Sequence, residues 1–147
     1  MNLPVLTIAS GNLRKVSEIS EMLDVLSLKV EKQPEYLNVE ETGKTYFENA
    51  LLKAKAASLE TKTWALADDS GLEVDVLDGR PGIYSARYAK NNDEKIKKLI
   101  NELSDSPYRS ARFISCMVLC DPKGNLVKDT TGTVSYTHLT LPTILRV

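Results

Sequence analysis

Apolar runs that predict strands alternate along this chain with amphipathic stretches that predict helices. The β-branched run at residues 5–9 and the apolar run at residues 111–120 predict buried strands. Residues 45–61 repeat apolar side chains at helical spacing and form the strongest helix pattern in the chain. A second such pattern covers residues 93–103, with Asp93 as the expected N-cap. Alternation of this kind predicts an α/β fold.

Composition indicates an ordinary globular protein with one domain. The chain has 147 residues, a net charge of -1, 42% hydrophobic residues and 27% charged residues. Near-neutral charge gives no general attraction to nucleic acid or to a membrane, and no apolar run is long enough to span a bilayer. The N-terminus lacks a signal-peptide pattern, so we expect a cytoplasmic protein. Cys116 and Cys120 are expected to be reduced core residues, and His138 is the only histidine.

Two adjacent acids interrupt the middle of the chain. The sequence Ala-Asp-Asp-Ser-Gly at residues 67–71 lies between the apolar residues 64–66 and the alternating residues 72–76. We therefore expect a strand that breaks at these acids. Neighbouring carboxylates repel each other, and a strand end can keep one structural and turn the other towards a cation or a water. A hydrophilic turn is the alternative, because Asp, Ser and Gly all favour turns.

A small polar turn follows the first strand. Residues 10–12 are Ser-Gly-Asn, and a helical pattern begins at Leu13. Unpaired backbone N–H groups at a helix start favour an anion, and Lys15 in the first turn adds a positive charge suited to a phosphate. An ordinary solvated helix lysine is the alternative.

Acidic and basic side chains in two further loops leave alternatives open. Glu40 and Glu41, just before the strongest helix, are either a solvated loop or ligands for a hard cation such as Mg²⁺, which needs one or two carboxylates. Asn49 is either a surface amide or a hydrogen-bond partner of a ligand. For Arg80 and Arg87 the alternatives are contact with an anion, contact across a dimer interface, or a structural salt bridge.

Four motifs together carry a family resemblance. They are S-G-N-L-R-K at residues 10–15, E-E-T-G-K-T-Y-F-E-N-A at 40–50, A-D-D-S-G-L at 67–72 and G-R-P-G-I-Y-S-A-R-Y at 79–88. From about Val5 to about Gly132 the chain closely resembles the inosine triphosphate pyrophosphatases, also called XTP/dITP pyrophosphatases. The resemblance implies Mg²⁺-dependent hydrolysis of ITP, dITP and XTP to the monophosphate and pyrophosphate. It also implies a homodimer with an elongated mixed α/β sheet, flanking helices and two lobes around a cleft.

The resemblance also implies roles for individual residues. Asp69 matches the proton acceptor and metal ligand, Glu40 matches a metal-binding acid, and Ser70 matches a substrate contact. Lys53 and Asp68 are implied to be supporting polar groups, with Lys53 near the substrate. The triphosphate-contacting turn, in which a serine replaces the family's usual threonine, comprises Ser10, Gly11, Asn12, Leu13, Arg14 and Lys15.

The family pattern stops near Thr133, before the segment that reads the purine base. We therefore expect residues 1–132 to be a partial nucleotide pyrophosphatase domain that lacks its C-terminal part. Residues 133–143 resemble a translated transposase-end sequencing adapter, so residues 133–147 are expected to be a non-native tail, and His138 is not the family's histidine. A divergent natural tail is the alternative.

The leading prediction is thus a purine nucleoside triphosphate pyrophosphatase with no nucleic-acid or membrane partner. A non-catalytic nucleotide- or phosphate-binding fragment is the first alternative. A septum-formation-inhibitor-type nucleotide pyrophosphatase is the second, and the motifs at residues 67–72 and 82–88 argue against it.

Overall fold

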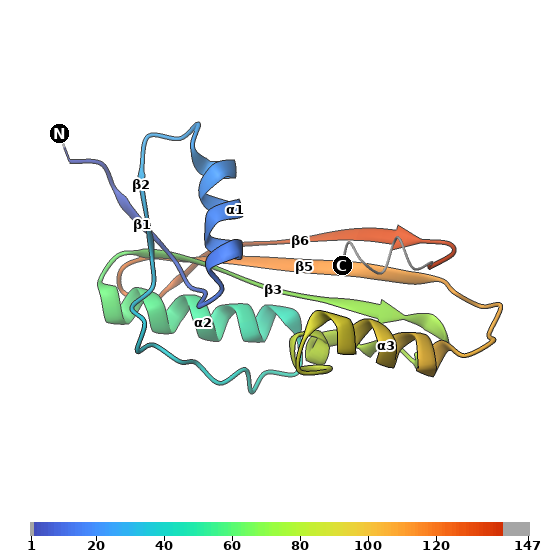
Figure 1. Cartoon of the computed structure of the whole chain (residues 1–147). Coiled ribbons are helices and arrows are strands. Elements are labelled where there is room, and N and C mark those ends of the chain that lie inside the picture. Colours follow the sequence, from blue (N-terminus) through green and yellow to red (C-terminus); the bar gives the residue numbers. More distant parts are fainter. Residues whose placement is uncertain (1, 140–147) are drawn as a thin grey trace. The chain divides into compact units, whose positions relative to one another are not determined.

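Strands and helices alternate in the computed structural model, which describes residues 2–139 (Figure 1). The elements in chain order are β1 (Val5–Ile8), α1 (Leu13–Leu23), β2 (Lys29–Lys32), α2 (Tyr46–Thr61), β3 (Trp64–Val74), η1 (Asp75–Leu77), β4 (Arg80–Pro81), η2 (Gly82–Arg87), α3 (Asn92–Leu103), β5 (Ala111–Cys120) and β6 (Leu126–Tyr136). None of the helices within residues 2–139 is long and apolar enough to cross a membrane.

One six-stranded mixed sheet organises these elements. The strand order is β2-β1-β3-β5-β6, and β4 pairs with β3 outside that path. β1 is parallel to both β2 and β3, whereas β4 is antiparallel to β3. Parallel neighbours need a long crossover connection, and α1 supplies it between β1 and β2. The predicted α/β class with a mixed sheet and flanking helices is confirmed.

The chain divides into two compact units. Unit 1 holds the residues up to Asp69 together with Cys116–Thr130, and unit 2 holds Ser70–Ser115 together with the residues from Thr131 onward. The unit boundary in β3 therefore falls between two neighbouring residues of the predicted site, Asp69 and Ser70.

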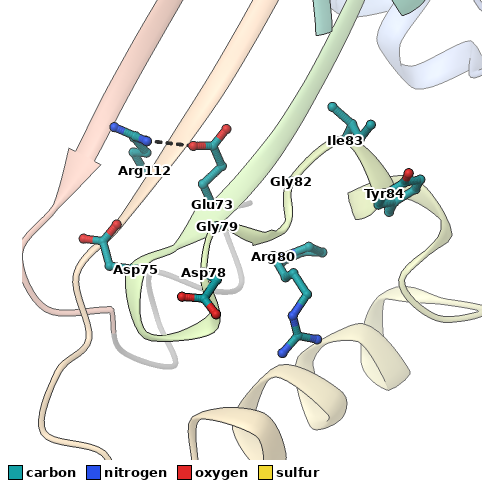
Figure 2. A pocket seen from close by; sticks show the side chains of 10 residues that line it. Glu73, Asp75, Asp78, Gly79, Arg80, Gly82, Ile83, Tyr84 and Arg112 are labelled. Atoms are coloured by element: carbon teal, nitrogen blue, oxygen red, sulfur yellow. Dashed lines mark hydrogen bonds and ion pairs between the residues drawn. The ribbon is translucent and has the colours of Figure 1, made fainter. Parts of the chain in front are cut away.

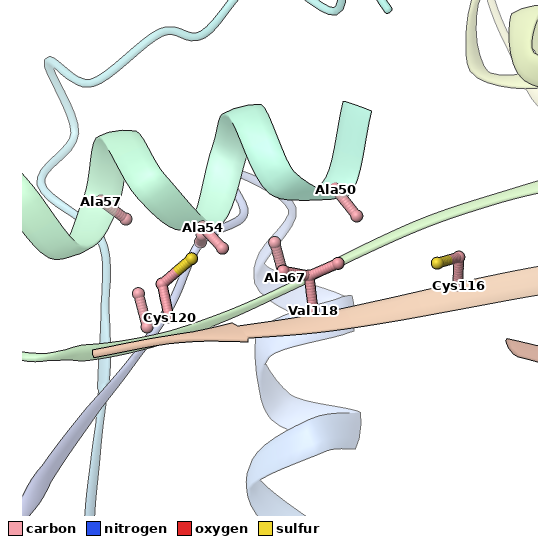
Figure 3. Close-up of a cluster of buried hydrophobic side chains, with 9 residues drawn as sticks. Ala50, Ala54, Ala57, Ala67, Cys116, Val118 and Cys120 are labelled. Atoms are coloured by element: carbon pink, nitrogen blue, oxygen red, sulfur yellow. The ribbon is translucent and has the colours of Figure 1, made fainter. Parts of the chain in front are cut away.

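Helices cover both faces of the sheet strands in unit 1. One face packs Leu6 and Ile8 of β1 and Leu66 of β3 against α1, whose Ile19 is buried. The other face packs against α2 through residues with small side chains, as Figure 3 shows. These residues are Ala9, Ala50, Ala54, Ala57, Ala65, Ala67, Cys116, Val118 and Cys120. Side chains alternate along a strand, so consecutive residues of β3 face different helices.

Unit 2 has its own hydrophobic core around α3. Leu99 and Leu103 of that helix are buried with Leu72 and Val74 of β3 and with further residues of the unit. Leu139 is fully buried in the same cluster. β6 also continues through Thr133 to Tyr136, so the beginning of the expected tail is part of the fold. Residues 140–147 of that tail lie outside the described residues, and the domain boundary at 132 stays a prediction.

Local signals placed most of the elements correctly. α2 has Thr45 as its N-cap, whose hydroxyl accepts a hydrogen bond from the Glu48 N–H group. The expected cap of α3 is wrong, because Asn91 caps that helix and Asp93 lies in its first turn. Both side chains suit a helix start, and the sequence did not distinguish the cap from the following turn.

The expected break at residues 67–71 is also wrong. β3 runs without interruption from Trp64 to Val74 and carries Asp68, Asp69 and Ser70 in its interior. The polar side chains do not end the strand because partners from other elements compensate their charges.

Candidate functional site

The turn after β1 is held by its own polar side chains. The Asn12 side chain accepts hydrogen bonds from the N–H groups of Arg14 (3.1 Å) and Lys15 (3.3 Å). The Ser10 hydroxyl accepts one from the Asn12 N–H group at 3.1 Å. Three N–H groups at this helix start are therefore already engaged. The positive charge available to an anion comes mainly from side chains, and Gly11, Asn12, Leu13 and Arg14 are exposed.

Asp68 connects this turn to the sheet. Its carboxylate oxygen Oδ1 lies 3.0 Å from Nζ of Lys15, which belongs to the first turn of α1. Its backbone carbonyl accepts a hydrogen bond of 2.6 Å from Nζ of Lys53 on α2. Lys53 also lies 3.9 Å from Oε2 of Glu41. The two predicted lysines thus converge on one residue of β3.

Asp69 belongs to the opposite face of the same strand. The buried Asn49 side chain of α2 donates a hydrogen bond of 3.3 Å to Oδ2 of Asp69. The Asn49 side-chain oxygen accepts a hydrogen bond of 2.7 Å from the Gly43 N–H group. Asn49 is therefore neither a surface amide nor a free ligand contact, but a buried bridge between the acidic loop and β3. Strand alternation keeps the carboxylates of Asp68 and Asp69 apart.

The environment of Asp69 changes its acidity. Burial raises the pKa of this carboxyl group from 3.8 to about 6, and the neighbouring Glu41 side chain, which is hydrogen-bonded to it, adds to the rise. Lys53 and Asn49 oppose the rise in pKa. The raised pKa means that Asp69 holds a proton more readily than an isolated carboxylate does, which is typical of acids that bind a cation or transfer a proton.

This pair fits a magnesium ion. Mg²⁺ binds through one or two carboxylates and completes its shell with water and phosphate oxygens. A bound cation would balance the negative charge of these two acids when they lose their shared proton. Residues 2–139 contain no group of three His, Cys, Asp or Glu side chains placed to hold a metal. The two carboxylates of this pair are the groups that would hold such a cation.

The structure places Glu40 and Glu41 differently. Glu40 is exposed, and its neighbour Glu41 is the residue beside Asp69. Reasoning from the sequence missed Glu41 as a partner of Asp69, because two adjacent glutamates in a loop carry no signal of which one points inward. The same reasoning found Lys15, Lys53 and Asp69 but gave no hint of the Lys15–Asp68 pair.

Ser70 begins unit 2 and is followed by a close backbone contact. A Cβ atom on Gly71 would lie 2.1 Å from the carbonyl oxygen of Gly82. The Ser85 hydroxyl accepts a hydrogen bond of 3.0 Å from the Leu72 N–H group and donates one of 2.6 Å to the Gly82 carbonyl. The A-D-D-S-G-L and P-G-I-Y-S motifs therefore meet at two glycines. The contact explains why residue 71 is a glycine, and Gly82 has a φ of 55°, a left-handed conformation that favours glycine.

A shallow cavity of about 500 Å³ also lies in unit 2, and Figure 2 shows its lining. Arg112 pairs with Glu73 at 2.9 Å there, and Arg80 pairs with Glu102 at 3.3 Å. Of the alternatives for Arg80, the structural salt bridge is the one observed. Arg87 lies over the Tyr84 ring, 5.5 Å from its centroid. The predicted catalytic, metal and phosphate residues do not line this cavity.

Comparisons with known proteins agree on one family. The profile of the Ham1 family matches residues 6–138. The dITP/XTP pyrophosphatase of Synechococcus sp. (strain CC9311) is 50% identical over 128 residues, which are 87% of this chain and 62% of that protein. The dITP/XTP pyrophosphatase of Synechocystis sp. (strain PCC 6803) is 42% identical over 133 residues, 90% of this chain and 69% of that protein.

Solved structures give the same result. A HAM1 protein from Coxiella burnetii superposes with a TM-score of 0.81 at 34% identity, over 90% of this chain and 72% of that chain. The Staphylococcus aureus Ham1 protein gives a TM-score of 0.77 at 39% identity, over 89% and 70%. This chain thus spans less than two thirds of the length of the Synechococcus relative and somewhat more of the others.

Proposed function

Because the chain belongs to the Ham1 family, we propose that it hydrolyses non-standard purine nucleoside triphosphates such as dITP, XTP and ITP to the monophosphate and pyrophosphate. One observation in unit 1 carries the proposal most directly. The buried Asp69 carboxyl group lies on the strand that also anchors Lys15 and Lys53, and the Glu41 side chain of the neighbouring loop is hydrogen-bonded to it. Acids that hold a cation beside lysines that hold phosphates are the groups this reaction needs. The family match favours this activity over that of a septum-formation-inhibitor-type pyrophosphatase.

The proposed reaction is attack of water on the α-phosphorus. The bond between that phosphorus and the oxygen leading to the β-phosphate breaks, and pyrophosphate leaves. Asp69 accepts the proton of the water, because a carboxyl group with a pKa of about 6 is ionised at neutral pH and is still basic enough to take a proton. The Lys15 and Lys53 side chains bind the phosphates, and the Ser10–Asn12 turn and Ser70 complete the contacts with substrate.

Glu41 and Asp69 are the residues we propose to hold Mg²⁺, and Glu40 remains a candidate on the same loop. Mg²⁺, when bound, supplies positive charge that neutralises the phosphates and activates water. Asn49 fixes the Asp69 carboxylate by its hydrogen bond and keeps the loop at Gly43 against α2.

Pyrophosphate release from dITP tests the proposal. We expect turnover with Mg²⁺ and loss of turnover when EDTA removes the metal. Asp69→Asn is expected to fold and to lose most hydrolysis, whereas Asp129→Asn, an exposed acid of β6, keeps it. Near-normal turnover by Asp69→Asn would contradict the assignment.

A non-catalytic nucleotide-binding fragment is the second candidate. It is favoured by one observation, that the chain spans 62% of the length of the Synechococcus relative. Saturable dITP binding without pyrophosphate release, in the presence of Mg²⁺, would establish it.

Assembly and location complete the proposal. We expect the full-length protein to form a homodimer in the cytoplasm, as the family resemblance implies. Sedimentation analysis measures the oligomeric state, and fractionation of cells that express the protein measures its location. A monomer across the micromolar range would contradict the dimer.

A further inference from the structure

Asp68 is a nearly buried acid to which the proposed reaction gives no role. Its side chain is 11% exposed and its carboxylate lies 3.0 Å from Nζ of Lys15. Its backbone carbonyl accepts the hydrogen bond from Nζ of Lys53 at 2.6 Å. Lysines from two different helices, α1 and α2, therefore end at the same residue of β3.

The Lys15–Asp68 pair differs from an ordinary surface pair in burial rather than in distance. Lys29 and Glu31 are also 3.0 Å apart, with side chains 64% and 44% exposed. The Lys15 and Asp68 side chains are 31% and 11% exposed. Exposed pairs contribute little because water and salt screen them, whereas a partly buried pair holds its members in place more firmly.

Holding a lysine in place matters for binding an anion. A free lysine side chain samples many rotamers, and ordering it on binding costs free energy. A lysine that is already ordered avoids most of this cost, so its contact with a phosphate is stronger. The Asp68 charge is balanced at this point by Lys15, and Lys53 adds a further positive charge on its backbone carbonyl. Glu41, 3.9 Å from Lys53, and the nearby Asp69 add negative charge, so the attraction to an anion depends on the ordered lysine side chains and not on the net charge of the group.

We propose that Asp68 is a positioning residue, which holds Lys15 ready for the polyphosphate group of the substrate. The proposal rests on the proposed function for the identity of the ligand, an inorganic or nucleoside polyphosphate. It assigns no bond-making step to Asp68. The opposite effect, repulsion of the incoming phosphates by the Asp68 carboxylate, is an outcome that the test below separates.

Binding of inorganic pyrophosphate in metal-free buffer is the primary test, because it probes the lysines without the metal. Asp68→Asn removes the charge but keeps the backbone carbonyl that Lys53 uses. We expect about tenfold weaker pyrophosphate binding in Asp68→Asn, a similar loss in Lys15→Ala and no further loss in the double variant, since coupled residues are not additive. Asp68→Glu, which keeps a carboxylate, should restore part of the affinity.

Glu31→Gln is the matched control, because it breaks an ion pair of the same length at an exposed position. It should leave pyrophosphate affinity unchanged. Thermal unfolding of each variant shows whether it is folded. Tighter binding in Asp68→Asn would show repulsion, and additive losses in the double variant would show independent roles. Either result, or no metal-free binding by the unsubstituted chain, overturns the proposal.

Steady-state hydrolysis of dITP with Mg²⁺ separates this proposal from the proposed function. Asp68→Asn should raise KM about tenfold and leave kcat nearly unchanged, because lost ground-state binding acts on KM. No hydrolysis by the unsubstituted chain would refute the proposed function, and the metal-free binding series would still decide the role of Asp68. Hydrolysis with an unchanged KM and unchanged pyrophosphate affinity in Asp68→Asn would refute the positioning role alone.

Discussion

Replacing Asp69 by asparagine should stabilise the protein while removing its proposed activity. Asp69 is 6% exposed, and its pKa rises from 3.8 to about 6 mainly because burial disfavours the charged form. That difference corresponds to about 3 kcal/mol of folding free energy lost when the group ionises. Asparagine has the same shape, can accept the Asn49 hydrogen bond and does not repel Glu41. We therefore expect Asp69→Asn to unfold later than the unsubstituted chain at pH 7.5.

The sign of the pH dependence follows from the raised pKa. A protonated Asp69 stabilises the folded state, and this stabilisation is fully present below pH 3.8 and is lost as pH rises through about 6. The advantage of Asp69→Asn should therefore be largest above pH 7 and should shrink towards pH 4.5. At pH 7.5 the gain in the free energy of unfolding has an upper limit of about 3 kcal/mol. A chain of this size gains about 3 °C in Tm for each kcal/mol.

Urea and thermal unfolding in EDTA at pH 7.5, 6.0 and 4.5 measure this effect without a bound metal. Glu40→Gln is the matched control, because it neutralises an exposed acid of the neighbouring loop and should leave stability unchanged. An Asp69→Asn variant that is no more stable at pH 7.5, or whose gain is the same at every pH, would refute the argument from burial.

Three further outcomes follow from the same geometry. Gly71→Ala should lower the free energy of unfolding by about 1–3 kcal/mol in urea titration, because its Cβ would meet the Gly82 carbonyl at 2.1 Å; an unchanged midpoint would show that the contact relaxes freely. Asn49→Ala should cost about 1–3 kcal/mol by leaving the Gly43 N–H group without its partner, and NMR titration should show a still higher pKa for Asp69, whereas an unchanged or lower value contradicts the bridge. The kcat/KM for dITP should rise with pH through about 6 as Asp69 ionises, and a flat profile between pH 5 and 7 would exclude Asp69 as the base.

Local signals made most of the fold predictable. The helix α2 could be predicted because its cap, its apolar periodicity and its end all depend on residues within or next to the helix. The uninterrupted course of β3 could not be predicted from local sequence. The charges of Asp68 and Asp69 have partners that lie 15 or more positions away in sequence, namely Lys15, Lys53 and Asn49. An isolated Asp-Asp-Ser-Gly string favours a turn, and tertiary contacts override that preference.

The site was predictable as a set of residues but not as a set of pairs. The chemistry of Asp69, Lys15 and Lys53 follows from residue type and family motif, whereas the choice of Glu41 over Glu40 as the partner of Asp69 depends on the course of one loop. Asn49 was visible as a polar residue near an apolar helix face. Its two contacts, with Gly43 and with Asp69, depend on the tertiary fold and could not be predicted from the sequence.

The alanines of α2 set the distance between this helix and the sheet in unit 1. Ala50, Ala54 and Ala57 are completely buried against strand residues, and their short side chains let the helix pack closely on the sheet. Short side chains such as that of Asn49 reach β3 only at such a separation. A single larger residue in this row would lift Asn49 away from Asp69 and Lys53 away from the Asp68 carbonyl at once. The hydrophobic packing of α2 and the reach of the proposed active-site residues are therefore set by the same distance.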